Sequence, residues 1–334
     1  MWRGIRYAGA AALVASTVAV LAPAAASNAA RQAGAVARSA ATSTKPKIWY
    51  VNPLFSYPLW QTSSNYFKQE AATNGYHATV VGNTQLNIPQ QLSDIDEAVT
   101  AGAQGIITCD LDPKTFGKTI KAAEAKGVVM VTIGCVDSIS DYSVGTDNAA
   151  WGIESAQIIA KHAGPDAVVG AVGTNLTTPN QAAAYHAFVA YAKVHYPKMH
   201  IVATEFDNSD PTKAASETTA MLTAYPNINA IWLFEGFAPS VMPRALAEAG
   251  KKPGQLFVLG VDALPATEAA IKSGWVSETL AQCWFWAGPF AAKLIAAKLA
   301  GHGPKQQSFN VKLYEVTKSR LPFNGCPASA YPSI

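Results

Sequence analysis

Charged side chains are scarce in this chain of 334 residues. They make up 14% of it, against 49% apolar residues, and the formal net charge is only +3. Such a composition excludes general disorder, because it supplies enough apolar surface for a core. No stretch is dense in Lys and Arg, so nucleic acid is not expected as a partner. The length and composition predict a globular protein of about two domains.

The residue patterns of catalytic and metal sites are also missing. The four cysteines, Cys109, Cys135, Cys283 and Cys326, have spacings that match no zinc motif. There is no G-x-S-x-G nucleophile elbow. The glycine pair in GAVG (170–173) lacks the third glycine of a dinucleotide-binding turn. The sequence therefore predicts no catalytic residue, no metal site and no cofactor.

Long apolar runs are missing after the N-terminal segment. Residues 1–30 begin with Arg3 and Arg6, continue as an Ala/Val/Leu run and end in small residues, which is typical of a secretory signal. Pro23 and the small-residue end favour cleavage, near Ala26 or Ala30, over an uncleaved membrane anchor. No cysteine follows that could carry a lipid. We expect an extracytoplasmic protein, either secreted or associated with the cell envelope.

The next segment, 31–46, is small and polar without periodicity, and it predicts a disordered linker. From Lys47 onward, short β-prone runs alternate with helical stretches, and the series starts again after about residue 147. The strands are continuous apolar runs, which indicates parallel sheets covered on both faces. The chain therefore predicts an α/β fold with two doubly wound parallel-sheet domains.

Ligands of such folds bind outside the carboxyl ends of the strands. These ends are rich in aromatic and carboxylate residues and hold no histidine, arginine or lysine. In chain order they are Pro53–Trp60, Cys109–Asp112, Gly134–Asp137, Thr174–Asn180, Phe206–Asp207, Glu235, Asp262 and Gln282–Trp286.

Several segments carry a resemblance to a known family. They are YPLWQTSSNYFKQEA after the first strand, AAEAKGVVMVTIG, YSVGTDNAAWG, FDNSDPTKAASETTAMLTAYPNINAIW and LGVDALPATEAAIKSGWVSETLAQ. In this order and spacing the chain resembles the type I periplasmic solute-binding proteins of ABC importers, in particular the ribose/galactose-binding group, over about residues 47–320. The resemblance implies two lobes joined by a three-crossing hinge, one of 47–147 plus 283–312 and the other of 148–282 plus 313–334.

The resemblance also implies a function and a site. The protein is expected to be a monomer that closes over a small sugar or polyol and delivers it to a membrane permease. Trp60 lies where the family stacks a ring on a sugar face, and Phe206 matches a second aromatic wall. Tyr57, Asp262 and the hinge-side Gln282 match polar contacts, and Glu235 falls where ribose-type members often carry Asn.

Two departures leave the ligand open. The family's Asp-Arg pair is here Gly134-Cys135, and an expected arginine is replaced by small residues around Ala184. Aromatic walls with acids but no arginine also suit a cationic or nitrogenous ligand. A glycoside-active enzyme is a third alternative, since paired carboxylates support glycoside hydrolysis.

Four further residues are candidates for ligand contact, namely Asp110, Cys135, Asn180 and Trp284. Asp110 precedes a helix that begins at Pro113, and capping of that helix is the alternative role. Cys109 and Cys135 end neighbouring strands, so a disulfide beside the cleft is one hypothesis. Free thiols, and a pairing of Cys283 with Cys326, stay open.

Overall fold

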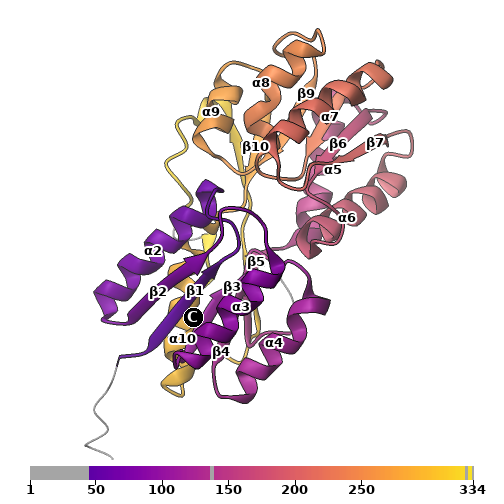
Figure 1. Ribbon diagram of the computed structural model, residues 1–334. Helices are drawn as coiled ribbons and strands as arrows, with labels where there is room; N and C mark the ends of the chain where they lie inside the picture. The colour runs from indigo at the N-terminus through magenta and orange to yellow at the C-terminus, as the bar shows by residue number, and fades with distance from the viewer. Residues whose placement is uncertain (1–44, 136–138, 328–329, 333–334) are drawn as a thin grey trace, which may run out of the picture. The chain divides into compact units, whose positions relative to one another are not determined.

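Figure 1 shows the computed structural model of the chain, which describes residues 45–135, 139–327 and 330–332. The leader predicted for 1–30 and nearly all of the linker predicted for 31–46 lie outside the described residues. Within the described part, no helix combines the length and the apolar character needed to span a membrane.

Strands and helices alternate along the described chain. The first array comprises β1 (Lys47–Asn52), α2 (Pro58–Asn74), β2 (His77–Gly82), α3 (Ile88–Thr100), β3 (Gly105–Thr108), α4 (Pro113–Ala125), β4 (Val129–Ile133) and β5 (Tyr142–Thr146). The second comprises α5 (Asn148–Ala163), β6 (Val168–Gly173), α6 (Pro179–His195), β7 (His200–Phe206), α7 (Pro211–Ala224), β8 (Ala230–Leu233), α8 (Ala238–Glu248), β9 (Phe257–Val261), α9 (Pro265–Lys272) and β10 (Glu278–Ala281). The 3₁₀ helix η1 (Trp284–Trp286), α10 (Ala287–Leu299), β11 (Ser308–Val311), β12 (Tyr314–Thr317) and the 3₁₀ helix η2 (Lys318–Arg320) follow.

The strands form two six-stranded sheets. The N-terminal sheet has the order β11-β5-β4-β3-β1-β2, and the C-terminal sheet has the order β12-β10-β9-β8-β6-β7. The described pairings are parallel except that of β12 with β10, which is antiparallel. The chain passes between the sheets after β5, after β10 and between β11 and β12 (Figure 1). This arrangement confirms the predicted fold of two doubly wound α/β domains with a three-crossing hinge.

Both faces of each sheet are buried, as the continuous apolar strands predict. In β3, Ile107 packs into the core that contains residues of α2 and α10, whereas its neighbour Ile106 packs into the core that contains residues of α3 and α4. Successive side chains of a strand point to opposite faces, so an uninterrupted apolar run serves two cores at once.

Most helices follow the preceding strand after a short loop, and polar caps and prolines mark where they begin. The carboxylate of Asp112 accepts from the backbone N–H of Lys114 at the start of α4, and that of Asp147 accepts from Ala150 in α5. Such caps satisfy N–H groups that have no partner inside the helix. Several first helical turns are therefore held at the carboxyl edges of the sheets.

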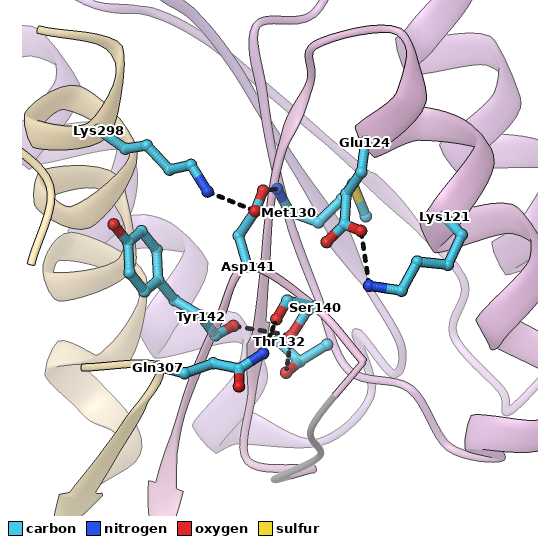
Figure 2. Close-up of polar contacts among 9 residues, drawn as sticks. All are labelled: Lys121, Glu124, Met130, Thr132, Ser140, Asp141, Tyr142, Lys298 and Gln307. Carbon is cyan, nitrogen blue, oxygen red and sulfur yellow. Dashed lines mark hydrogen bonds and ion pairs between the residues drawn. The ribbon is translucent and has the colours of Figure 1, made fainter. Parts of the chain in front are cut away.

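Polar side chains also connect α10 and the chain after it to the N-terminal sheet (Figure 2). Asp141 accepts from the backbone N–H of Met130 at 3.0 Å and pairs with Lys298 near the end of α10. The Ser140 hydroxyl lies 3.0 Å from the Thr132 hydroxyl, and the backbone carbonyl of Ser140 accepts from the Gln307 amide at 2.6 Å. These contacts hold chain from beyond residue 283 against the first array.

Close packing of α5 on α6 depends on a glycine. A Cβ atom added at Gly152 would lie 2.0 Å from the carbonyl oxygen of Ala184. We expect Gly152→Ala to lower the free energy of unfolding by about 1–3 kcal/mol, because the two helices would have to separate. Urea denaturation measures this change.

Gly117 provides the matched control for that substitution. It also lies inside a helix, α4, but a Cβ atom there would meet its nearest neighbour, Ile139, at 3.8 Å. Gly117→Ala should raise the free energy of unfolding by about 0.5–1 kcal/mol, because alanine loses less backbone entropy than glycine. Equal effects of the two substitutions would contradict the packing argument.

Candidate functional site

A cavity lies at the carboxyl ends of the strands of both sheets. Its volume is about 620 Å³ when the part open to solvent is counted. The N-terminal sheet contributes residues that follow β1 to β4, and the C-terminal sheet contributes residues that follow β6 to β10. Because parallel strands end at the same edge, side chains far apart in the sequence meet here.

Most of the residues predicted from the sequence line this cavity. They are Tyr57, Trp60, Glu235, Asp262 and Gln282, with Cys135, Asn180 and Trp284 from the second group of candidates. Phe206 and Asp110 are not part of its wall.

Both of these residues are packed outside the cavity wall. Phe206 ends β7, the edge strand of its sheet, and it packs half-buried against the core of the C-terminal sheet. Asp110 is fully buried and lies between Cys109 and Leu111, which both line the cavity.

A hydrogen bond crosses the cavity wall from one sheet to the other. The Tyr57 hydroxyl, before α2, donates to Oδ2 of Asp262, which follows β9. Both side chains are almost fully buried. Burial raises the pKa of Asp262 to about 6, although the bond from Tyr57 opposes that rise. Burial and the charge of Asp262 raise the pKa of Tyr57 well above its ordinary value.

Gly236 makes room for this tyrosine. A Cβ atom at position 236 would lie 1.7 Å from the Tyr57 hydroxyl oxygen. The next residue, Phe237, packs edge-to-face on the Tyr57 ring with the centroids 4.8 Å apart. Tyr57 is therefore enclosed by the segment that follows β8 as well as by Asp262.

Aromatic rings form much of the remaining wall. Trp60 in the first turn of α2 and Trp284 in η1 have ring centroids 5.3 Å apart. A Cβ atom at Gly134 would lie 2.8 Å from Trp60, so this glycine provides space for the indole. Trp151 adds a third indole from α5 and is missing from the sequence prediction. The sequence signal that could have identified Trp151 is the one that Trp60 carries, a tryptophan in the first turn of a helix that follows a strand.

Glu235 lines the cavity, and its carboxylate also makes hydrogen bonds inside the protein. Its carboxylate accepts from the backbone N–H groups of Phe237, at 3.0 Å, and of Ala238, where α8 begins. It lies beside the buried Asp207, whose Oδ1 accepts from the N–H of Ser209 at 2.8 Å. Glu235 thus lines the cavity with a carboxyl group that is already used to cap a helix.

These two carboxyls depart from their ordinary acidity. Burial is the main cause for both: it raises the pKa of Asp207 to about 7 and that of Glu235 well above the usual range. The neighbouring carboxyl raises the pKa of Glu235 further, because two negative charges at short range are unfavourable.

The cysteines are joined in two disulfides. Cys109 pairs with Cys135, with Cα atoms 5.2 Å apart, and Cys283 pairs with Cys326, with Cα atoms 5.6 Å apart. Both Cys109 and Cys135 line the cavity, so the first disulfide is part of its wall.

The cavity wall holds few charged side chains. Among the described lining residues there is no lysine, arginine or histidine, and Glu235 and Asp262 are the carboxyls. No group of three or more His, Cys, Asp or Glu side chains that could hold a metal ion occurs in the described part of the chain.

Four buried polar atoms in the wall have no hydrogen-bond partner. Three belong to donors, namely Nε1 of Trp151, Nε2 of Gln282 and Nε1 of Trp284, and the fourth is the acceptor Oδ1 of Asp262. Buried polar groups are normally paired, so unpaired ones in a cavity indicate where a ligand binds. This wall offers hydrogen bonds to a molecule that both accepts and donates.

The buried acid at Asp207 should make stability depend on pH. The folded protein holds this proton up to about pH 7, whereas the unfolded chain has released it by pH 5. Raising the pH from 5 to 8 should therefore lower the free energy of unfolding, by about 1–3 kcal/mol from this group. Urea titrations of wild type and Asp207→Asn should show a smaller fall in the variant.

Asp112 is the control for this pH experiment. Its hydrogen bond with Thr115 lowers its pKa, so it is ionised between pH 5 and 8 whether the chain is folded or not. Asp112→Asn should leave the pH dependence unchanged. A wild-type stability that rises over this interval would contradict the assignment.

The contact of Tyr57 with Gly236 is open to a double-mutant cycle. Gly236→Ala should lower the free energy of unfolding by about 1–3 kcal/mol in the wild type, because the methyl group collides with the tyrosine. In a Tyr57→Ala background most of that loss should vanish, which gives a coupling of about 1 kcal/mol or more. Additive effects would show that the two residues do not share this contact.

The cavity and the fold have clear counterparts among known proteins. A family model described as "Periplasmic binding protein domain" matches residues 48–303. The ribose import binding protein RbsB of Salmonella typhimurium is 26% identical over 258 residues, which cover 74% of this chain and 84% of that protein. The D-allose-binding periplasmic protein of Escherichia coli is 25% identical over 239 residues, covering 68% and 76%.

Solved structures show the same fold. GanP, a glucose-galactose binding protein from Geobacillus stearothermophilus, has a TM-score of 0.79 at 23% identity, and the match covers 84% of this chain and all of that one (100%). A solute-binding protein from Burkholderia graminis in complex with D-arabinose has a TM-score of 0.81 at 20% identity, covering 85% and 100%. These relatives are binding proteins, not enzymes. With its two-sheet fold, three-crossing hinge and matched family model, the chain belongs to the periplasmic binding protein family, of the type I architecture.

Proposed function

We propose that this protein is the extracytoplasmic solute-binding component of an ABC importer and that it binds a small sugar or polyol. The observation that carries the proposal is the set of unpaired atoms in the wall, three donors and one acceptor. A sugar hydroxyl can donate one hydrogen bond and accept others, so a few hydroxyls could satisfy both kinds of atom.

The same atoms argue against a cationic ligand. An ammonium group donates hydrogen bonds and accepts none. It would serve Oδ1 of Asp262 but leave the two indole N–H groups and the Gln282 amide without an acceptor. The similarity to proteins named for ribose and allose binding, and to a solute-binding protein solved in complex with D-arabinose, gives independent support for a sugar.

The side chains divide into two roles in this proposal. Trp60 and Trp284 offer flat apolar surfaces to the C–H face of a sugar ring, and Oδ1 of Asp262 and the amide of Gln282 bind its hydroxyls. A hydrogen bond to a charged acceptor is stronger than one between neutral groups, so Asp262 should be the dominant polar contact. Tyr57 acts mainly through its bond to Asp262.

Closure of two lobes supplies the affinity in this mechanism. The lobes would be 47–147 plus 283–312 and 148–282 plus 313–334. A ligand that contacts both shifts an open/closed equilibrium by its differential contacts with the two states. The bond from Tyr57 to Asp262 would strengthen the closed state, which a membrane permease would then recognise on a monomeric protein.

A ligand panel tests the proposal. Pentoses, hexoses, polyols and primary amines are added separately to the purified protein, and the melting temperature is measured. At least one sugar or polyol should raise it, because binding to the folded state stabilises that state by mass action. Stabilisation by amines alone would reject the sugar proposal.

Two variants then locate the site. Gln282→Ala should weaken the sugar found in the panel about tenfold, which corresponds to about 1.4 kcal/mol, the size of a lost hydrogen bond. Calorimetric titration measures the affinity. Gln157→Ala removes an exposed amide on α5 that bonds to Tyr191, away from the cavity, and should leave the affinity unchanged.

A further inference from the structure

The two halves of the cavity wall differ in polarity. The half that follows β1 to β4 consists mainly of apolar groups, namely Leu54, Trp60, Leu86, Leu111 and the Cys109–Cys135 disulfide. The half that follows β6 to β10 holds most of the polar lining residues, namely Thr174, Thr178, Asn180, Gln181, Ser209, Glu235, Asp262 and Gln282, beside the apolar Phe234, Phe237 and Val261. The cavity is therefore divided between an apolar and a polar side.

The few polar atoms on the apolar side do not change this division. The Tyr57 hydroxyl is already engaged by Asp262. Trp284 follows β10 in the chain but packs on Trp60 of the apolar side, where it supplies one unpaired N–H group. No strong hydrogen-bond donor or acceptor is offered by the side chains of Leu86, Leu111, Cys109 and Cys135. A disulfide sulfur is a poor acceptor, and a leucine side chain has no polar atom.

A fully hydroxylated sugar does not match such a wall. Its rim carries hydroxyls in most directions, and those facing the leucines and the disulfide would lose water without gaining a partner. A ring that lacks a hydroxyl on that side would instead bury a methyl or methylene group against apolar atoms, which is favourable.

We propose that the ligand is a deoxysugar whose methyl group lies against the Cys109–Cys135 disulfide and Leu111, with its hydroxyls toward Asp262 and Gln282. This inference rests on the proposed function and specifies the substrate class. A 6-deoxyhexose is its simplest form, because it differs from the parent hexose by one oxygen atom.

Matched sugar pairs test the assignment. Calorimetric titration of the purified protein compares L-rhamnose with L-mannose and L-fucose with L-galactose, the members of each pair differing only in the oxygen at C6. The deoxy member of at least one pair should bind at least tenfold more tightly than its parent hexose. Equal or tighter binding of the hexose in every pair that binds overturns the deoxysugar assignment and leaves the sugar-binding proposal standing. Binding of none of these sugars, nor of any in the wider panel, overturns both.

A variant pair tests the place of the methyl group. Leu111→Asn puts a polar partner on the apolar side and should reduce the preference for the deoxy member to less than threefold. Leu299, an exposed leucine at the end of α10, is the control, and Leu299→Asn should keep the full preference. A preference unchanged in a folded Leu111→Asn protein, as judged by circular dichroism, would show that the methyl group does not lie there.

Discussion

The hydrogen bond from Tyr57 to Asp262 connects the two halves of the molecule at the site itself. The residues are 205 positions apart, one following the first strand of the N-terminal sheet and the other following β9 of the C-terminal sheet. Around this bond, Gly236 leaves space for the tyrosine, and Phe237 packs on its ring.

Buried acidity is the main electrostatic feature of the polar side. Asp207, Glu235 and Asp262 are all buried at the edge of the C-terminal sheet, and no lysine or arginine lines the cavity beside them among the described residues. Backbone N–H groups compensate instead: those of Phe237 and Ala238 serve Glu235, and that of Ser209 serves Asp207. Backbone hydrogen bonds and raised pKa values thus reduce the cost of burying these carboxyls. Oδ1 of Asp262 has no hydrogen-bond partner and is free to bind a ligand.

The apolar side of the cavity depends on residues that follow β3 and β4. Gly134 and Cys135 follow β4, and Cys135 forms a disulfide with Cys109 at the end of the neighbouring strand. The glycine admits the Trp60 ring, and the disulfide places sulfur atoms in the wall. The segment that follows β4 therefore supplies both the space for an indole ring and an apolar part of the wall.

The sequence by itself determined the class of fold and the edge at which the site lies. Uninterrupted apolar strands require sheets covered on both faces, and parallel strands bring their carboxyl ends together, so the aromatic and acidic residues after those strands could be placed at one cavity. Tertiary structure decided which of them reach it. Phe206 and Asp110 lie outside the cavity wall, whereas the carboxylate of Glu235 lines it and also accepts from backbone N–H groups at the start of α8. Trp151 reaches the cavity from a helix whose orientation no local pattern specifies. Side-chain direction and hydrogen-bond partners depend on packing between distant segments, and that information is not contained in any short stretch of the chain.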